Sequence, residues 1–283
     1  MILLMKVIKN LLPYFIIKRM KNRGDKKPSV PVKLKTSLSD NGIYPQFCLD
    51  AANDLRVFSN FRQNDIYRQI LEHVDEKTGG GYLEEITRIN PNLIKEIDKI
   101  KANDIYGNPS LYDYKAIGKI CPSTLRYAKV FADLVYHFDS LDGLKIAEIG
   151  VGYGGQCRII NALAKPSEYT LVDIKPALLL AQVYLDGYIL SSVMKYTTMN
   201  ELNRERYDLV ISNYAFTELR RDIQDAYLEK IILNSKHGYI TYNETNPKEF
   251  RSYTRDELVR KIPSARIIEE IPKTAEKNCI IIW

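Results

Sequence analysis

Beyond residue 143 the chain alternates short apolar runs with segments of helical periodicity. Five of these runs each predict a buried strand: 144–149, 169–174, 192–196, 207–213 and 237–243. The alternation is typical of a parallel sheet with crossover helices. Two more runs, 265–271 and 278–283, are separated only by a short loop and must therefore pair antiparallel. We expect a Rossmann-like α/β sheet of seven strands, mostly parallel, with the last one antiparallel.

The part of the chain from about residue 44 to 140 has a mostly helical pattern. Apolar positions recur at three- and four-residue spacing, with glycine or proline between the segments. The predicted helices cover 50–61, 64–74, 81–89, 91–100 and 123–138. The last is the strongest, and Ser123 is its expected N-cap. A helix is also expected over 217–233, after the fourth strand, and one over 254–262, which would begin at a capping box of Thr254 and Glu257.

The first 43 residues form a basic arm and linker. Residues 1–35 contain ten Lys or Arg and one Asp, although the whole chain carries a formal charge of only +6. The arm is too short and too interrupted to span a bilayer, and its apolar helical face predicts peripheral contact of residues 1–30 with an anionic inner membrane, or docking on a partner subunit. Because the charge sits in the arm, no nucleic-acid groove is expected. Four widely spaced cysteines indicate a reducing compartment, so we expect a cytoplasmic protein. The sequence indicates no particular oligomeric state.

A glycine-rich turn, AEIGVGYGGQCR at 147–158, follows the first predicted strand. Its glycines fit two patterns, the G-x-G-x-x-G of dinucleotide binders and the E-x-G-x-G-x-G of S-adenosylmethionine-dependent methyltransferases. A dinucleotide places its pyrophosphate on such a turn, where Glu148 would repel it. S-adenosylmethionine offers a sulfonium cation, an amino group and ribose hydroxyls, which a carboxylate stabilises. Asp173 ends the second strand 19 residues after Gly154, where an acid can accept both ribose hydroxyls of either cofactor. Glu148 and the closing antiparallel strand pair, with which the methyltransferase variant of the doubly wound sheet ends, favour the methyl donor.

Ligands of doubly wound sheets bind beyond the carboxyl ends of the strands, so the polar residues there are the candidates. The expected donor-binding residues are Glu148, Gly150, Gly152, Tyr153, Gly154, Gln156, Asp173 and Asn213. The expected acceptor-binding residues are Arg126, Tyr127, Tyr214, Tyr242 and Asn243. Residues 196–201 are expected to touch adenine. Tyr214 and Tyr242 could instead be packing residues, and Arg126 could instead form a surface ion pair.

Four segments together resemble the sugar O-methyltransferase family of bacterial surface-polysaccharide gene clusters. They are AEIGVGYGGQCR, YDLVISNYAFTEL at 207–219, NDIYGNP at 103–109 and CPSTLRYAKV at 121–130. The resemblance covers about residue 60 to the C-terminus, and Val151 stands where the family pattern leads us to expect another glycine. It implies a class I methyltransferase fold at 141–283, a helical substrate-side region at 44–140, S-adenosylmethionine as donor and a sugar or glycan hydroxyl as acceptor.

Such a reaction needs a group that takes the proton from a weakly acidic hydroxyl. Glu218 is the expected base, in the first turn of the helix after the fourth strand, although an acid there also complements a helix dipole. Glu244 is the second candidate. None of the three histidines follows a strand end, and no metal is expected because the fourth strand ends in Ser212–Asn213 without an aspartate. Two other functions remain open, a dinucleotide-dependent sugar-modifying oxidoreductase and an inactive methyltransferase fold used as an interaction module.

Overall fold

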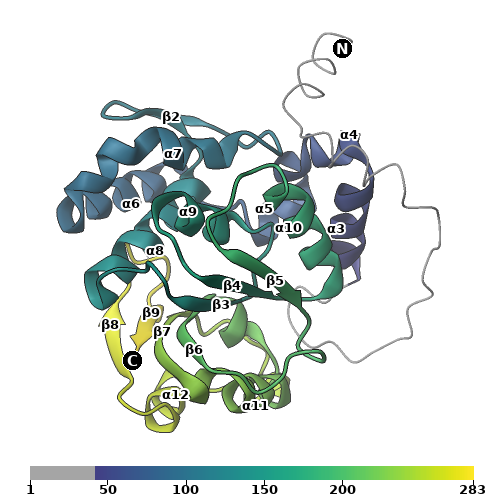
Figure 1. Cartoon of the computed structure of the whole chain (residues 1–283), viewed down its shortest axis with the longest axis vertical. Coiled ribbons are helices and arrows are strands. Elements are labelled where there is room, and N and C mark those ends of the chain that lie inside the picture. The colour runs from purple at the N-terminus through teal and green to yellow at the C-terminus, as the bar shows by residue number, and fades with distance from the viewer. Residues whose placement is uncertain (1–41) are drawn as a thin grey trace.

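A seven-stranded sheet runs through the computed structural model, which describes residues 42–283 (Figure 1). The strands are β3 (Lys145–Ile149), β4 (Glu168–Val172), β5 (Val193–Thr197), β6 (Tyr207–Asn213), β7 (Ser235–Tyr242), β8 (Arg266–Glu269) and β9 (Cys279–Ile282). They lie in the order β5-β4-β3-β6-β7-β9-β8. Strands β3 to β7 are parallel, and β9 runs antiparallel to both of its neighbours. The predicted fold class is confirmed.

Helices cover both faces of this sheet, in keeping with the apolar, buried central strands β3, β6 and β7, while the edge strands β5 and β8 are more exposed. One face packs against α8 (Pro122–Phe138), α9 (Gly155–Leu163) and α10 (Lys175–Leu185), and the other against α11 (Arg221–Lys230) and α12 (Arg255–Lys261). Alternation along β3 separates the two cores, since Ile146 belongs to the first cluster and Ala147 to the second.

The region before the sheet contains short helices and one hairpin. The elements are α3 (Ile43–Asn53), α4 (Leu55–Phe58), α5 (Asp65–Ile70), α6 (Glu76–Ile89), α7 (Ile97–Lys101), β1 (Tyr112–Tyr114) and β2 (Gly118–Ile120). Helix α3 lies against α10, α6 against α8, and α7 against α9. The buried side chains of Phe61 and Tyr67 belong to the same hydrophobic cluster as Ile146 of the sheet. This continuous core fixes the helical region over one end of the sheet.

Several element boundaries differ from the predicted ones. The helix expected over 50–61 begins at Ile43 and breaks at Asp54, whose side chain accepts the N–H of Arg56 and caps a new helix. Helix α8 begins at Pro122 with Cys121 at the N-cap, so Ser123 is not the cap. The helix expected over 217–233 is shortened to α11, with a 3-10 turn on each side (Ala215–Glu218 and Ile232–Asn234). The β1–β2 hairpin has strands of three residues, too short for a periodic signal.

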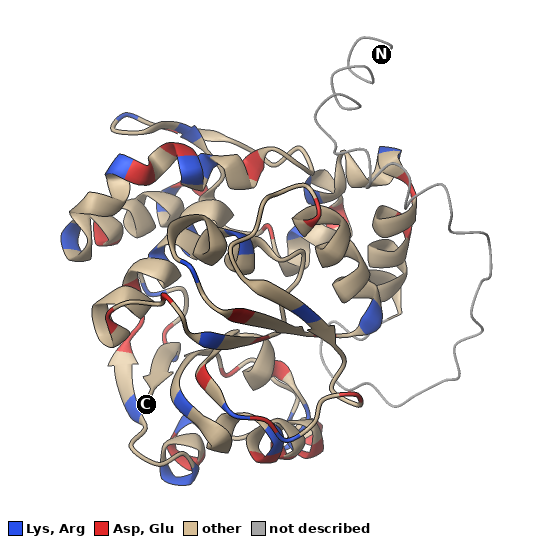
Figure 2. Cartoon of the chain, viewed as in Figure 1, with Lys and Arg blue, Asp and Glu red and all other residues tan. Residues whose placement is uncertain are grey.

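Helix α12 starts at the predicted capping box. The Glu257 N–H donates to Thr254 Oγ1 at 3.3 Å, and the Thr254 N–H donates to Glu257 Oε2 at 2.8 Å. Along α6, α7, α11 and α12, Lys and Arg alternate with Asp and Glu (Figure 2). Some of these charges pair across the surface, as Arg221 does with Glu257 at 3.0 Å, and such exposed pairs add little stability.

The basic arm predicted for residues 1–43 lies, apart from its last two residues, outside the described residues, and its membrane contact stays a prediction. Within residues 42–283, no helix combines the length and the apolar character needed to cross a bilayer.

Candidate functional site

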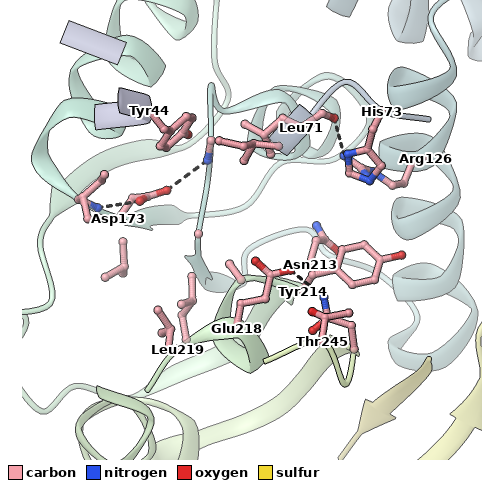
Figure 3. Close-up of a pocket in the computed structure, with 18 of the residues that line it drawn as sticks. Tyr44, Leu71, His73, Arg126, Asp173, Asn213, Tyr214, Glu218, Leu219 and Thr245 are labelled. Atoms are coloured by element: carbon pink, nitrogen blue, oxygen red, sulfur yellow. Dashed lines mark hydrogen bonds between the residues drawn. The ribbon is translucent and has the colours of Figure 1, made fainter. Parts of the chain in front are cut away.

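A cavity of about 870 Å³ lies beyond the carboxyl ends of the parallel strands, the edge where the sequence places the ligand site. Every parallel strand contributes to its wall, through Gly150, Asp173, Thr198, Asn213 and Asn243. The helical region supplies the facing wall, including Tyr44, Leu71, His73, Tyr82 and Arg126. Figure 3 shows Tyr44 and Asp173 at one side of the cavity, His73 and Arg126 at the other, and Asn213, Tyr214 and Glu218 along the wall below.

The turn after β3 brings backbone to the cavity because two of its residues have no side chain. Gly150 and Gly152 have φ values of 77° and 54°, a region that glycine adopts without strain. A Cβ at Gly150 would lie 2.0 Å from the Cβ of Ala215, and a Cβ at Gly152 would lie 2.7 Å from Leu71 Cδ1. Both predicted glycines line the cavity. Gly150 has no room for a methyl group, and at Gly152 the end of the Leu71 side chain would have to move.

Asp173 holds this turn. Its Oδ2 accepts the N–H groups of Val151 at 2.8 Å and Gly152 at 3.2 Å, and its Oδ1 accepts that of Ile174 at 2.7 Å. Burial raises the pKa of Asp173 to about 6, and the three backbone bonds lower it by less. A carboxylate oxygen accepts more than one hydrogen bond, so Oδ1 retains a position for a hydroxyl from the cavity.

Two more amides of the turn are occupied. The Gly150 N–H donates to Val172 O at 2.9 Å, and the Gly154 N–H donates to Val151 O at 2.8 Å. With the two amides on Asp173, four N–H groups of the turn are engaged. At Val151 and Gly152 the turn therefore presents the Asp173 carboxylate, and not free donors, to the cavity.

The side chains of Tyr214, Glu218 and Asn243, which follow β6 and β7, form the cavity wall between Asp173 and Arg126. Glu218 Oε1 accepts the amide Nδ2 of Asn243 at 2.7 Å, and burial raises the pKa of the Glu218 carboxyl. Glu218 ends the single 3-10 turn after β6, so it does not lie in the first turn of α11 as predicted. Tyr214 has a φ of 66°, unusual for a residue with a side chain, and its hydroxyl donates to Glu270. Backbone held in such a conformation is common at functional sites.

Residues 70–82 were not expected at the site, yet several of them line the cavity. His73 is among them. Partial burial lowers its pKa, and the nearby Arg126 cation lowers it further, which keeps the imidazole neutral at pH 7. The expectation that no histidine contributes was therefore based on too narrow a criterion, because it considered only positions after strand ends. Nothing in the periodicity of 64–74 marks this segment as part of a cavity.

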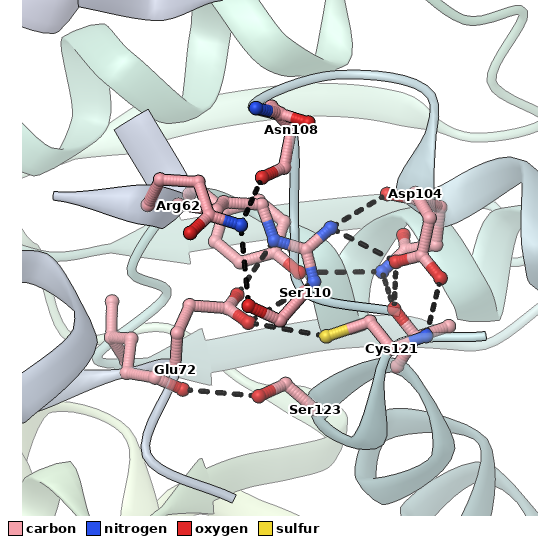
Figure 4. Close-up of polar contacts among 12 residues, drawn as sticks. Arg62, Glu72, Asp104, Asn108, Ser110, Cys121 and Ser123 are labelled. Carbon is pink, nitrogen blue, oxygen red and sulfur yellow. Dashed lines mark hydrogen bonds and ion pairs between the residues drawn. The ribbon is translucent and has the colours of Figure 1, made fainter. Parts of the chain in front are cut away.

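A buried ionic network holds that segment in place (Figure 4). Arg62 Nε lies 2.7 Å from Glu72 Oε1, and its Nη1 lies 3.0 Å from Asp104 Oδ1. The side chains of these three residues are 0%, 5% and 8% exposed. The Glu72 carboxylate also accepts from Cys121 Sγ at 3.3 Å. Since Glu72 lies between Leu71 and His73, the network fixes both cavity residues through their shared backbone.

Three predicted donor-binding side chains lie away from the cavity. Glu148 is buried on the α9 side of β3, where it accepts the Tyr169 hydroxyl at 2.7 Å, and burial raises its pKa to about 8. Tyr153 is fully buried among aromatic rings and lies under the guanidinium of Arg62, 4.9 Å from ring centroid to Cζ. Gln156 donates to Tyr127 O at 3.2 Å and accepts from Asn213, so it supports a cavity residue without lining the cavity.

Four further predicted residues also lie outside the cavity lining. Gly154 is the N-cap residue of α9 and faces Leu185. Tyr127 packs edge-on against Tyr153, and Tyr242 is buried in the core beside α12, so the packing interpretation holds for Tyr242. Glu244 pairs with Lys277 at 2.8 Å on the surface, which removes it as the second candidate base.

The structure brings the other predicted residues to the cavity wall: Gly150, Gly152, Asp173, Asn213, Arg126, Tyr214, Glu218 and Asn243. Thr198, Met199 and Asn200 of the expected adenine segment also line it. Within residues 42–283 there is no group of three or more His, Cys, Asp or Glu side chains that could hold a metal ion.

Gly150→Ala is expected to destabilise the protein by about 1–3 kcal/mol beyond the cost of the left-handed φ, because the new Cβ overlaps Ala215. Gly143→Ala is the matched control, since Gly143 has a φ of 74° and nothing within 4 Å of its added Cβ. Urea unfolding of both variants measures the difference. Equal losses of stability would show that the turn has room for a side chain.

No protein-family model matches the sequence, and no curated protein matches it. Among solved structures, the chain is similar to magnesium protoporphyrin IX methyltransferase (ChlM) from Synechocystis PCC 6803 with bound SAM, at 15% identity and a TM-score of 0.43, over 56% of this chain and 76% of that one. It is also similar to the pyocyanin biosynthetic protein PhzM, at 12% identity and a TM-score of 0.41, over 57% of each chain. A third similar structure is the methyltransferase domain of bacterial CtHen1, at 15% identity and a TM-score of 0.40, over 56% of this chain and 96% of that one. Two of the three are named as methyltransferases, but these likenesses are too distant to carry an argument about binding or activity.

Proposed function

We propose that this chain is an S-adenosylmethionine-dependent O-methyltransferase that acts on a sugar hydroxyl of a bacterial surface glycan or its precursor. The observation that carries the proposal is the Asp173 carboxylate, which occupies the amides of Val151 and Gly152 at the cavity. A pyrophosphate would find a negative charge there in place of free N–H groups, so the turn disfavours a dinucleotide. Ribose hydroxyls of a donor without phosphate can instead donate to Asp173.

The residues present fit the donor along the length of the cavity. Asp173 would hold the ribose, and Thr198, Met199 and Asn200 would lie beside the adenine. S-adenosylmethionine supplies an activated methyl group on a sulfonium. Asn213, Tyr214 and Glu218 line the middle of the cavity, where they can align an acceptor oxygen for in-line displacement.

Glu218 is the proposed acceptor of the hydroxyl proton. Burial raises its pKa, which brings a carboxylate closer to the range where it accepts protons efficiently at neutral pH. Asn243 donates to Oε1 at 2.7 Å, which orients the carboxylate. His73 is the second candidate, because it also lines the cavity and is held neutral.

The sugar acceptor rests on the sequence resemblance and on the chemistry of the cavity wall. Hydroxyl-rich ligands need hydrogen-bonding groups and flat apolar rings, and Tyr82, Tyr214, Asn213 and Asn243 provide both. Calorimetric titration of the full chain with S-adenosylmethionine and with NAD tests the cofactor. We expect saturable binding of the first and none of the second. Binding of NAD alone would favour the oxidoreductase, and donor binding without transfer of a labelled methyl to isolated surface glycan would favour the inactive fold.

Asp173→Asn is expected to weaken S-adenosylmethionine binding by about 1.5–3 kcal/mol, the range for hydrogen bonds to a charged group. Calorimetry measures the loss. Asp208→Asn is the matched control, because the Asp208 carboxylate also accepts a backbone N–H, from Lys145 at 2.8 Å, but lies near the opposite end of β6. Unchanged donor affinity in the Asp173 variant would contradict the assigned donor position.

Donor binding is expected to depend on pH through Asp173. The ionised carboxylate accepts hydrogen bonds from the donor much more strongly than the protonated acid does, and burial raises its pKa in the free protein to about 6. The binding constant should therefore be flat above pH 7 and fall as the pH drops through 6, approaching about tenfold per pH unit. Titrations from pH 5 to 8 measure this profile. A profile in Asp173→Asn that falls as steeply as that of the parent would assign the dependence to another group.

A further inference from the structure

Arg126 is a buried cation at the end of the cavity away from Asp173. Its side chain projects from α8, the residue is 7% exposed, and it lines the cavity beside His73 (Figure 3). Its Nη2 donates to Leu71 O at 3.2 Å. Its Nε is fully enclosed and has no hydrogen-bond partner. The guanidinium also contacts Tyr127, by a side-chain hydrogen bond and with its Cζ 5.4 Å from the ring centroid. Since a guanidinium carries five N–H donors in a planar fork, donor capacity remains, the enclosed Nε included.

The groups around Arg126 do not neutralise it. The titratable groups that interact with the Arg126 cation are the hydroxyls of Tyr127, Tyr82 and Tyr214. Burial raises the pKa of Tyr82 to about 12 and raises the pKa of the other two as well, so all three are uncharged at pH 7. No ion pair joins Arg126 to a carboxylate among residues 42–283. A buried charge without a counter-ion is costly to maintain.

Two other buried arginines serve as comparisons. Arg62 is paired with two carboxylates. Arg158 resembles Arg126: it is 7% exposed, donates to one carbonyl, Lys99 O, and lies over a ring, Tyr188, at 4.8 Å, but it lies away from the cavity. Among the described arginines, Arg126 is alone in having an enclosed nitrogen without a partner. It also has the ligand cavity in front of it.

We infer that Arg126 binds an oxyanion of the acceptor, so that the acceptor is an acidic sugar or sugar phosphate and not a neutral one. This rests on the proposed function, since it names the acceptor class of the same site. A carboxylate or phosphoryl group matches the guanidinium fork and supplies the missing negative charge. Lys175 and Lys273 add two further cations to the cavity lining. Asp75, Asp173 and Glu218 also line the cavity, so the attraction is local to the Arg126 end and is not a property of the whole cavity.

The test uses inorganic phosphate and acetate as probes of the full chain. Thermal unfolding is followed while either anion replaces chloride at constant ionic strength. A saturable rise in Tm is expected with at least one anion in the parent protein, and the anion that acts tells a phosphoryl from a carboxylate group. A rise without saturation reflects the general effect of phosphate on protein solvation and contradicts the site. Arg126→Gln should lose the saturable response, and Arg158→Gln, the matched buried arginine, should keep it.

A second measurement uses only the parent protein, in case Arg126→Gln does not fold. The Arg126 cation lowers the pKa of His73, so an anion on Arg126 should raise it. The chain has three histidines, and the ring resonances of His73 can be followed by NMR over pH with and without the anion. No upward shift, or a response in Arg126→Gln equal to the parent's, would overturn the inference. Donor titration in the same samples separates the two proposals: failure to bind S-adenosylmethionine contradicts the proposed function, whereas donor binding without an anion response contradicts only the acidic acceptor. The donor carries a carboxylate of its own, so an anion response that saturating S-adenosylmethionine abolishes would assign Arg126 to the donor and overturn the acidic acceptor.

Discussion

Glu218→Gln is expected to lower turnover by roughly 10²–10⁴-fold at saturating donor and acceptor, because the amide keeps the shape of the side chain but cannot take the hydroxyl proton. The Asn243 bond to Oε1 can be kept, since the carbonyl oxygen of Gln accepts it equally. Donor affinity should change little, because Asp173 and the glycine turn lie elsewhere on the cavity wall. Single-turnover transfer of a labelled methyl group measures the effect.

His73→Gln provides the comparison, since His73 is the second candidate base on the cavity wall and its imidazole is neutral at pH 7. If Glu218 is the base, the rate of the parent should fall as the pH drops through the raised pKa of Glu218. The pH–rate profile of Glu218→Gln should lack this decrease. A loss in His73→Gln alone, with Glu218→Gln within about threefold of the parent, would transfer the role to His73.

Arg62→Met is expected to reduce the free energy of unfolding by about 3–5 kcal/mol at pH 7, because it leaves the buried carboxylates of Glu72 and Asp104 without their cation. Burial already raises the folded-state pKa of Asp104, and the loss of the Arg62 cation, which lowers it, would raise it further above its unfolded value. The buried carboxylates destabilise the folded state only at a pH where they are ionised. The difference in the free energy of unfolding between Arg62→Met and the parent should therefore become smaller as the pH falls toward 4. Urea unfolding at pH 7 and pH 5 measures it.

Arg56→Met is the control for removing a paired arginine. Arg56 and Asp54 lie 3.0 Å apart with side chains 80% and 39% exposed, so this variant should unfold at nearly the same urea concentration as the parent. An Arg62 variant as stable as the Arg56 variant would show that the buried network does not hold residues 71–73 in place.

The sheet was predictable because each of its strands is a separate apolar run, and because a short loop leaves the last two no alternative to antiparallel pairing. The donor end of the site was predictable for a related reason. Gly150, Gly152 and Asp173 follow strands directly, and parallel strands bring their carboxyl ends to one edge. Glu148 and Tyr153 were misplaced, because adjacency to the turn does not determine which side of the strand or helix a side chain faces.

The acceptor end was only partly predictable. Arg126 and Tyr214 were found from their positions next to the domain and the fourth strand, but Leu71, His73 and Tyr82 were not. Their placement depends on contacts between residues far apart in sequence, such as Arg62 with Asp104 and Leu71 with Arg126. No local pattern encodes such contacts. The choice between Glu218 and Glu244 likewise depended on the tertiary structure, in which Glu244 lies on the surface beside Lys277 and outside the cavity lining.

A crystal structure of the full chain with S-adenosylhomocysteine tests the central claim most directly. The account predicts that the ribose hydroxyls lie within hydrogen-bond distance of Asp173, that the adenine lies beside Thr198–Asn200, and that the sulfur faces the part of the cavity lined by Asn213, Tyr214 and Glu218. Density for the ligand outside this cavity, or a ribose that makes no contact with Asp173, would contradict it.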